Sequence, residues 1–427
     1  MKVLIVGGGG REHAIALKIK ENPEVTALYA APGNGGIAQI ATCLPFKATD
    51  VDGIVRWAAE NKVDFVIVAP DDPLCLGMVD ALAEQGIPAF GPRKNAAIIE
   101  GSKVFSKNLM KKYGIPTAAY ETFDDYDAAV KYLQTADMPI VVKADGLALG
   151  KGVLICPDRE SAVAAVASMM KEAKFGASGA RVVIEEFLTG PEVSVLAFTD
   201  GKTVKPMVSS MDHKRALDHD EGLNTGGMGT IAPNPCYTPE LARRCMDEIF
   251  LPTIAAMNAE GRTFTGCLYF GLMMTPKGPK VIEYNCRFGD PETQVVLPLL
   301  KSDLLTIMRA TVDGTLADTP VEFASGAACC VVLASGGYPV SYKSGYPISG
   351  LDEAGKTATV FHAGTKLVDG QIVTAGGRVL GVTATADTLE AAIDKAYQAA
   401  DKITFTDMHM RRDIGQRALA SRKESHS

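Results

Sequence analysis

Short apolar runs alternate with helical patterns over the first hundred residues. We expect strands at Val3–Val6, Ala27–Ala30, Phe65–Ala69 and Ile87–Phe90, with helices between them. Strands that alternate with helices are typical of a parallel sheet covered by helices on its faces. The pattern therefore predicts a parallel-sheet α/β domain over residues 1–101.

The middle of the chain has a different pattern, with more strands and fewer helices. A helix is expected at Lys103–Tyr113, where a new unit begins. Residues 117–190 have the pattern of a small α+β unit, and residues 191–300 are mainly strands with one long helix. We predict a second domain over residues 102–324, whose mobile small lobe is at about 117–190.

The last hundred residues form a third unit. After Ala324 the chain has short alternating strands, closed by a helix at Thr388–Ala400. This pattern predicts a separate, small C-terminal domain of α+β or β type over residues 325–424. The final residues, 421–427, are expected to be a disordered tail. The predicted fold class is thus a multidomain protein with α/β and α+β parts.

Composition and charge exclude some classes of function and partner. The chain has 427 residues, 47% of them hydrophobic, and a net charge of −7, which does not favour a nucleic-acid partner. No apolar run reaches the length of a membrane span, and the first one is too short for a signal peptide. Nine cysteines without a Cys-x-x-Cys pair indicate reduced thiols. We expect a cytoplasmic monomer that does not bind membranes.

A glycine cluster, Gly7–Gly10, joins the first strand to the first helix. Bare backbone N–H groups at a helix N-terminus favour a bound anion. A nicotinamide cofactor is disfavoured, because the third glycine of G-x-G-x-x-G would fall at Glu12 or His13 and the second strand does not end in an acidic residue. Tight packing of strand against helix is the alternative explanation.

The segment VVKADGLALGKGV at 141–153 places a lysine at the end of a buried strand and a glycine-rich loop after it. A buried lysine needs an anionic partner, and the amides of such a loop can close over phosphates. The segment thus predicts a nucleotide-phosphate site without the order of a P-loop. A solvated hairpin is the alternative.

Two further segments suit a nucleotide site. The acid-rich turn EEFLTGPE at 185–192 could receive adenine and ribose, and an exposed turn is the alternative. The cations of DHKR at 212–215, followed by the glycine loop NTGGMG at 224–229, suit a mobile lid over transferring phosphates. A solvated basic turn is the alternative there.

Glu283 and Asn285 lie two residues apart in a predicted strand and so share one face. Two oxygen ligands on one face suit Mg²⁺ or Mn²⁺. Arg287 follows on the same side, where a guanidinium can clamp an anion. A buried structural ion pair is the alternative.

In this order, the motifs resemble the ATP-grasp ligases, and among them the phosphoribosylamine–glycine ligase family, also called glycinamide ribonucleotide synthetases. The resemblance spans nearly the whole chain and is most specific at 141–153 and at EYNCRFGDPETQ, 283–294. It implies a pre-ATP-grasp domain, an ATP-grasp fold and a C-terminal domain. It also implies ATP-dependent ligation of glycine to 5-phosphoribosylamine through a glycyl phosphate, the second step of de novo purine biosynthesis.

The resemblance also implies roles for individual residues. ATP would contact Lys103, Lys143, Asp145, Gly146, Gly150, Lys151, Gly152, Glu185, Glu186, Leu188 and Glu192. The catalytic residues would be Asp212, Lys214, Arg215, Arg287 and Asp290. The other substrates would contact Gly9, Arg11, Asn34, Gly35, Gly36, Asp72, Asn224, Gly226 and Gly227. Mg²⁺ or Mn²⁺ would bind Glu283 and Asn285.

Two other functions stay open at this stage. One is another ATP-grasp carboxylate–amine ligase or carboxylase of purine metabolism, which would use a different acid. The other is a nucleotide-binding regulatory protein without turnover. The lysines together with Glu283, Asn285 and Arg287 disfavour the regulatory protein, because binding alone does not need all of them.

Overall fold

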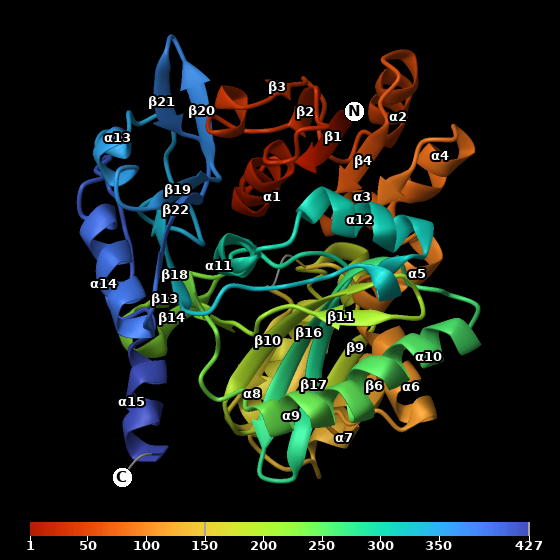
Figure 1. The fold of residues 1–427 in the computed structure, drawn as a ribbon. Helices are drawn as coiled ribbons and strands as arrows, with labels where there is room; N and C mark the ends of the chain where they lie inside the picture. Colours follow the sequence, from red (N-terminus) through yellow and green to blue (C-terminus); the bar gives the residue numbers. More distant parts are fainter. Residues whose placement is uncertain (149–150, 426–427) are drawn as a thin grey trace.

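The computed structural model describes residues 1–148 and 151–425, and Figure 1 shows three regions that follow one another along the chain. The first contains the predicted parallel sheet, whose strand order is β3-β2-β1-β4-β5. Its strands are β1 (Lys2–Gly7), β2 (Ala27–Pro32), β3 (Thr42–Cys43), β4 (Phe65–Val68) and β5 (Ala89–Phe90). Its helices are α1 (Gly10–Lys20), α2 (Val51–Glu60), α3 (Asp71–Cys75), α4 (Met78–Glu84) and α5 (Lys94–Gly101).

The second region contains two lobes, each with its own sheet. The small lobe has the antiparallel sheet β6-β9-β7-β8 and a separate apolar core against its helices. Its elements are β6 (Tyr120–Phe123), α7 (Tyr126–Leu133), β7 (Ile140–Ala144), β8 (Val153–Cys156), α8 (Arg159–Met170) and β9 (Val182–Glu186). An independent core lets this lobe behave as one rigid unit.

The large lobe has the sheet β11-β10-β16-β17. Its strands are β10 (Glu192–Thr199), β11 (Val204–Pro206), β16 (Gly266–Thr275) and β17 (Gly278–Asn285). Its helices are α6 (Lys103–Tyr113), α9 (Pro239–Cys245) and α10 (Leu251–Ala259). Two later helices contact other regions: α11 (Thr293–Val296) packs against α1 and the C-terminal sheet, and α12 (Leu304–Asp313) packs mainly against α1 and β5. The one long helix predicted within residues 191–300 contains a π-helical stretch at Met246–Phe250, between α9 and α10.

The C-terminal region contains a sheet with the strand order β12-β15-β18-β22-β19. Two of these strands, β12 (Met211–Asp212) and β15 (Gly229–Ala232), come from the middle of the chain. The others are β18 (Ala327–Ala334), β19 (Thr359–His362) and β22 (Arg378–Ala386). Two hairpins, β13 (Arg215–Leu217) with β14 (Glu221–Asn224) and β20 (Thr365–Val368) with β21 (Gln371–Thr374), and the helices α13 (Leu351–Ala354) and α14 (Leu389–Ala400) complete the region.

The prediction of a disordered tail is wrong for residues 421–425, which belong to helix α15 (Gln416–Ser425). Side chains in its first turns hold this helix in place. Ala418 is fully buried, and Arg417 forms an ion pair with Asp220 at 2.7 Å. Polar composition therefore misled the prediction, because an anchored helix start can order the residues that follow.

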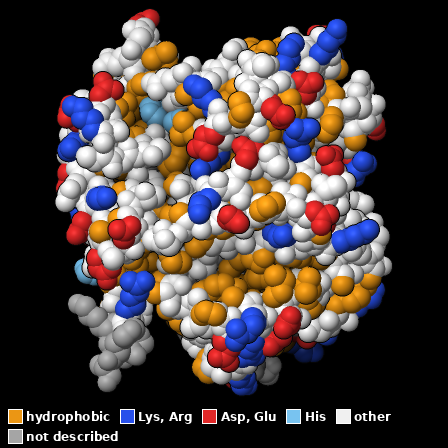
Figure 2. Space-filling model, in the orientation of Figure 1, with side chains coloured by type: hydrophobic (Ala, Val, Ile, Leu, Met, Phe, Trp, Pro, Cys, Tyr) orange, Lys and Arg blue, Asp and Glu red, His pale blue; other side chains and the backbone are white. Residues whose placement is uncertain are grey.

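Charged side chains of both signs are scattered over the face of the molecule seen in Figure 2. In the residues that the structure describes, no helix is long and apolar enough to cross a membrane.

A histidine pair connects the first and last regions. The backbone N–H of His362 on β19 donates to Nδ1 of His13 on α1 at 2.8 Å, and both side chains are buried. Burial lowers the pKa of His13 to about 3 and that of His362 to about 4. Both rings are therefore neutral at pH 7, and His13 accepts a hydrogen bond that joins two regions.

We expect the stability of the protein to fall as the pH decreases from about 6.5 towards 4. The unfolded chain gains a proton on each histidine near its ordinary pKa of about 6.5, whereas the folded chain does not, so each contributes a loss of about 1.4 kcal/mol per pH unit. The His13→Gln variant keeps a hydrogen-bond acceptor. Its Tm should decrease less between pH 7.5 and pH 5 than the Tm of the wild type. An equal decrease in both proteins would contradict this role of His13.

Candidate active site

Three buried side chains form a charged group beside the strands β7, β9 and β17. Lys143 on β7 forms an ion pair with Glu185 on β9 and donates to the carbonyl of Ile282 at 3.2 Å. Lys107 on α6 forms an ion pair with the other oxygen of Glu185 at 3.0 Å. Each of the three is at most 5% exposed. Two ammonium groups against one carboxylate leave an excess positive charge, which suits a phosphate.

The electrostatics of this group agree with its geometry. Burial alone would raise the pKa of Glu185, but the two lysines outweigh it and hold that pKa below its usual range. Burial lowers the pKa of Lys107. The sequence analysis missed Lys107, although it lies four residues after Lys103 on one helix, a spacing that places both on one face.

The loop after β7 is attached to the start of α6. Asp145 accepts hydrogen bonds from the Ser102 hydroxyl and the Val104 amide, both at 2.9 Å, and pairs with Arg181. Lys103 donates its Nζ to the carbonyl of Gly146 at 2.9 Å. These contacts set where the glycine-rich loop begins.

The other predicted residues of this loop differ in their surroundings. Lys151 is exposed, whereas Gly152 is buried and its carbonyl accepts from the amide of Ala144 at 2.8 Å. Gly150, also predicted to contact ATP, lies outside the described residues. The structure thus places both ends of the loop near Lys143.

The predicted adenine and ribose residues lie at the end of β9 and just after it. Glu186 is exposed; it accepts from the amide of Ala119 at 3.1 Å and pairs with Lys280 at 3.3 Å. Leu188 is half-buried and Glu192 is exposed at the start of β10. Leu188 and Glu192 therefore lie on the connection between the two lobes, while Glu186 makes contacts of its own with the large lobe.

Glu283 and Asn285 share one face of β17, and Tyr284 between them is buried on the other. Within residues 1–148 and 151–425, the Glu283 carboxylate makes no hydrogen bond or ion pair, although its negative charge acts on Lys103. Asn285 donates its Nδ2 to Glu100 at 3.0 Å, which leaves its Oδ1 available. A free carboxylate and an amide oxygen fit a hard divalent cation.

Protein side chains supply only part of such a cation's coordination. The described part of the chain contains no cluster of three or more His, Cys, Asp or Glu side chains that could hold a metal ion. Oxygen atoms of phosphate and water would therefore have to complete the coordination.

Arg287 is held at one edge of its guanidinium group. Its NH2 group pairs with Glu100 at 3.0 Å and its NH1 donates to the carbonyl of Phe288 at 3.3 Å. Its Nε is buried and has no hydrogen-bond partner among the described residues. A buried donor without a partner is costly, so this atom is suited to an incoming anion. The sequence analysis missed Glu100.

A second charged group surrounds Asp212 at the end of β12. Its carboxylate pairs with Lys214 at 3.2 Å, and Glu292 lies nearby with only 3% exposure. Tyr269 donates its hydroxyl to Glu292 at 3.2 Å. Burial, together with the charge of Asp212, raises the pKa of Glu292 to about 7. The structure does not bring Arg215 into this group, because its guanidinium donates to Gly222 within its own hairpin.

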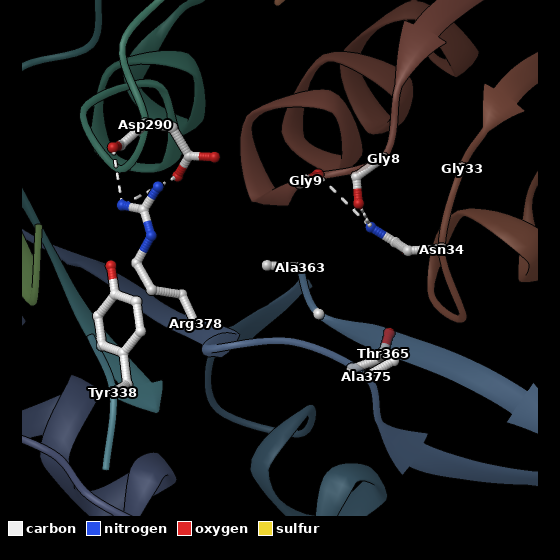
Figure 3. Close-up of a pocket in the computed structure, with 11 residues that line it drawn as sticks. Gly8, Gly9, Gly33, Asn34, Asp290, Tyr338, Ala363, Thr365, Ala375 and Arg378 are labelled. Carbon is white, nitrogen blue, oxygen red and sulfur yellow. Dashed lines mark hydrogen bonds and ion pairs between the residues drawn. The ribbon is translucent and has the colours of Figure 1, made fainter. Parts of the chain in front are cut away.

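A cavity of about 340 Å³ lies between the first and last regions (Figure 3). It is lined by Gly8, Gly9, Gly33, Asn34, Asp290, Tyr338, Ala363, Gly364, Thr365, Ala375 and Arg378. Asn34 donates to the carbonyl of Gly8 at 3.0 Å, and Arg378 donates to the backbone carbonyl of Asp290 at 2.9 Å. The sequence analysis missed Tyr338, Thr365 and Arg378.

Four more of the predicted substrate residues are glycines near the cavity or the charged groups. Gly35 and Gly226 lie beside the cavity, since Gly35 donates its amide to the carbonyl of Thr365 and Gly226 donates its amide to the Tyr338 hydroxyl. Gly36 packs against His13 and His362, and Gly227 packs against Asp212.

The structure does not bring the other predicted substrate residues to the cavity wall. Arg11 pairs with Glu12 at 2.8 Å, and Asn224 is half-buried in β14. Asp72 is exposed on α3. The neighbouring Asp71 is the acid whose charge acts on Arg287 and Glu100.

Comparison with known families gives three consecutive matches. They are the N domain of phosphoribosylglycinamide synthetase at residues 1–100, its ATP-grasp (A) domain at 101–293 and its C domain at 328–417. Together these matches cover most of the chain.

Individual relatives agree over their full lengths. The chain is 49% identical over 425 residues to the phosphoribosylamine–glycine ligase of Halalkalibacterium halodurans, covering 100% of this chain and 99% of the relative. It is 48% identical to that of Caldanaerobacter subterraneus, covering 97% of this chain and 99% of the relative.

Solved structures show the same arrangement. The crystal structure of the Thermotoga maritima phosphoribosylamine–glycine ligase matches with a TM-score of 0.86 and 34% identity over 97% of this chain and 100% of that one. The biotin carboxylase domain of Hydrogenobacter thermophilus 2-oxoglutarate carboxylase shares the fold, with a TM-score of 0.72 and 18% identity over 96% and 91% of the two chains. The chain therefore belongs to the phosphoribosylglycinamide synthetase family of ATP-grasp ligases.

Proposed function

We propose that this protein joins glycine to 5-phosphoribosylamine at the expense of ATP, giving glycinamide ribonucleotide, ADP and phosphate in the second step of de novo purine biosynthesis. The observation that carries the proposal is the match to ligases of this activity over the full length of the chain. The buried cations, the Glu283–Asn285 pair and the cavity beside Asn34 support it, because each substrate then has a site of suitable chemistry.

ATP lies between the two lobes in this proposal. Lys143 and Lys103 contact its phosphates, and the loop at 145–152 closes over them. The adenine meets Glu185 and the backbone of Leu188, while Glu192 accepts the ribose hydroxyls. The excess positive charge around Glu185 supports this placement, since a bound phosphate would neutralise it.

Glu283 and Asn285 hold Mg²⁺ or Mn²⁺ in this proposal. Such an ion, when bound, neutralises charge on the phosphate oxygens and aligns them for transfer. In this proposal, β17 presents the oxygen atoms of Glu283 and Asn285 on one face, and Arg287 comes two residues later in the chain.

The ligation proceeds in two steps in this proposal. An oxygen of the glycine carboxylate attacks the γ-phosphorus, so that glycyl phosphate forms and ADP leaves. The amine of 5-phosphoribosylamine then attacks the glycyl carbon, phosphate leaves and the amine loses a proton. Arg287 and Lys214 hold the transferred phosphate, and Asp212 and Asp290 receive the amino groups. No nucleophilic side chain is needed, because positioning and fixed charges supply the catalysis.

The first experiment measures phosphate release from ATP with Mg²⁺ and glycine, with and without freshly generated phosphoribosylamine, and identifies each product by mass. The proposal expects glycinamide ribonucleotide only when all substrates are present. Turnover with bicarbonate or another acid in place of glycine would instead support a different ATP-grasp ligase. No turnover with any acid would favour a regulatory protein.

Lys143→Ala should raise the KM for ATP by about tenfold or more, since a charge-assisted hydrogen bond to phosphate contributes about 1.5–3 kcal/mol. The protein should still fold, because Glu185 keeps its ion pair with Lys107. Steady-state kinetics at varied ATP would measure the effect, and Lys111→Ala, an exposed lysine on α6, is the matched control. An unchanged KM and kcat would refute the phosphate contact of Lys143.

Glu283→Gln should reduce kcat by about 100-fold or more and raise the Mg²⁺ concentration needed for half-maximal activity, because it removes the charged ligand. Its Tm should stay within about 1 °C of wild type, since the Glu283 carboxylate makes no hydrogen bond or ion pair within the described residues. Rates over a Mg²⁺ titration and a thermal melt would check both. Full activity at limiting Mg²⁺ would show that Glu283 is not a metal ligand.

A further inference from the structure

Glu100, at the end of α5, receives hydrogen bonds from three consecutive residues of the active-site strand and the turn after it. Its carboxylate accepts from Nδ2 of Asn285 at 3.0 Å, from the amide of Cys286 at 2.7 Å and from the NH2 group of Arg287 at 3.0 Å. The side chain is only 7% exposed. A single buried acid on one helix thus holds the side chains of both the proposed metal ligand and the proposed anion clamp.

We infer that Glu100 is a positioning residue that sets the orientation of the Asn285 amide and the Arg287 guanidinium together. The inference rests on the proposed function insofar as Asn285 binds a cation and Arg287 an anion. Glu100 itself touches neither substrate nor metal in this inference; it acts through the two side chains that it holds.

The orientation of Asn285 follows from hydrogen-bond chemistry. An ionised carboxylate only accepts hydrogen bonds, so the Asn285 amide must present its nitrogen to Glu100. Its Oδ1 then faces away from Glu100 and stays available on the face of β17 that Glu283 shares. Without this acceptor, the amide is free to turn over and present its nitrogen to the cation, which would weaken binding.

The orientation of Arg287 follows from the same contact. Glu100 holds one terminal nitrogen and the carbonyl of Phe288 holds the other, which leaves the buried Nε without a partner. A guanidinium has five N–H donors in a rigid plane, so fixing one part of it directs the rest. The free donor is therefore aimed before an anion arrives.

Packing of the helix does not explain the acid. Ala96, Ala97 and Ile99 on α5 are at most 1% exposed and already bury this helix against the core. A buried ion pair often contributes less to stability than apolar side chains of the same size. Orientation of the neighbouring functional groups accounts for a buried carboxylate at this position.

The test measures the Mn²⁺ dissociation constant of Glu100→Gln and of the wild type in the presence of ADP. Electron paramagnetic resonance monitors the binding, and no turnover is needed. Glutamine keeps the shape of the side chain but replaces one carboxylate oxygen with an NH2 group. That NH2 group must then face at least one of the three N–H groups that now donate to Glu100. Loss of a residue that orients a ligand typically costs about 10- to 100-fold in metal affinity or activity. We expect a rise of that size in the Mn²⁺ dissociation constant and a similar fall in kcat. Unchanged Mn²⁺ affinity and kcat would overturn the inference.

A double-mutant comparison separates positioning from a merely structural role. If Glu100 acts through Asn285, Glu100→Gln should weaken Mn²⁺ binding much less in an Asn285→Ala background than in wild type. Equal, additive losses in both backgrounds would refute action through Asn285. Glu84→Gln, an exposed acid on α4, is the matched control and should leave Mn²⁺ affinity, kcat and Tm unchanged.

The binding measurement also keeps this inference separate from the proposed reaction. If the protein uses an acid other than glycine, no glycinamide ribonucleotide would form. The Mn²⁺ affinities of Glu100→Gln and wild type in the presence of ADP could still be measured and compared. A failure of the proposed substrate and a failure of the positioning role therefore give different results.

Discussion

The cost of burying charge is the constraint on which the rest of the active site depends. A buried ion costs several kcal/mol unless an opposite charge and hydrogen bonds compensate for it. Glu185 meets this condition only when α6 and β7 bring their lysines to β9, and Arg287 meets it only when α5 brings Glu100. The charges therefore join elements from distant parts of the chain, so that the fold and the candidate active site form together.

The C-terminal region belongs to this assembly because it holds the segment that carries Asp212 and Lys214. Arg411, only 1% exposed, donates to the backbone carbonyl of Arg215 at 3.2 Å, and the amide of Gly415 donates to Nε2 of His213 at 3.1 Å. Since β12 and β15 also pair within the C-terminal sheet, this segment cannot move independently of that region.

The sequence predicted features that depend on neighbouring residues and missed those that depend on distant ones. The parallel first sheet, the helix at Lys103–Tyr113 and the shared face of Glu283 and Asn285 follow from local periodicity, and the structure contains them. The contact between Glu100 and Arg287 joins positions 187 residues apart, which no local pattern encodes. Helix α15 was missed for the same reason, because its order comes from contacts outside itself.

The glycine loop at 224–229 shows how the structure changes an interpretation based on composition. Its glycines suggest a flexible lid, but two of them allow close approach to charged groups. A Cβ atom on Gly227 would lie 2.6 Å from an Asp212 oxygen, and one on Gly226 would lie 2.8 Å from the Arg378 guanidinium. Asp212 belongs to the charged group with Lys214, whereas Arg378 lines the cavity between the first and last regions. The loop therefore packs between the two, and its small residues let both charged side chains approach its backbone closely.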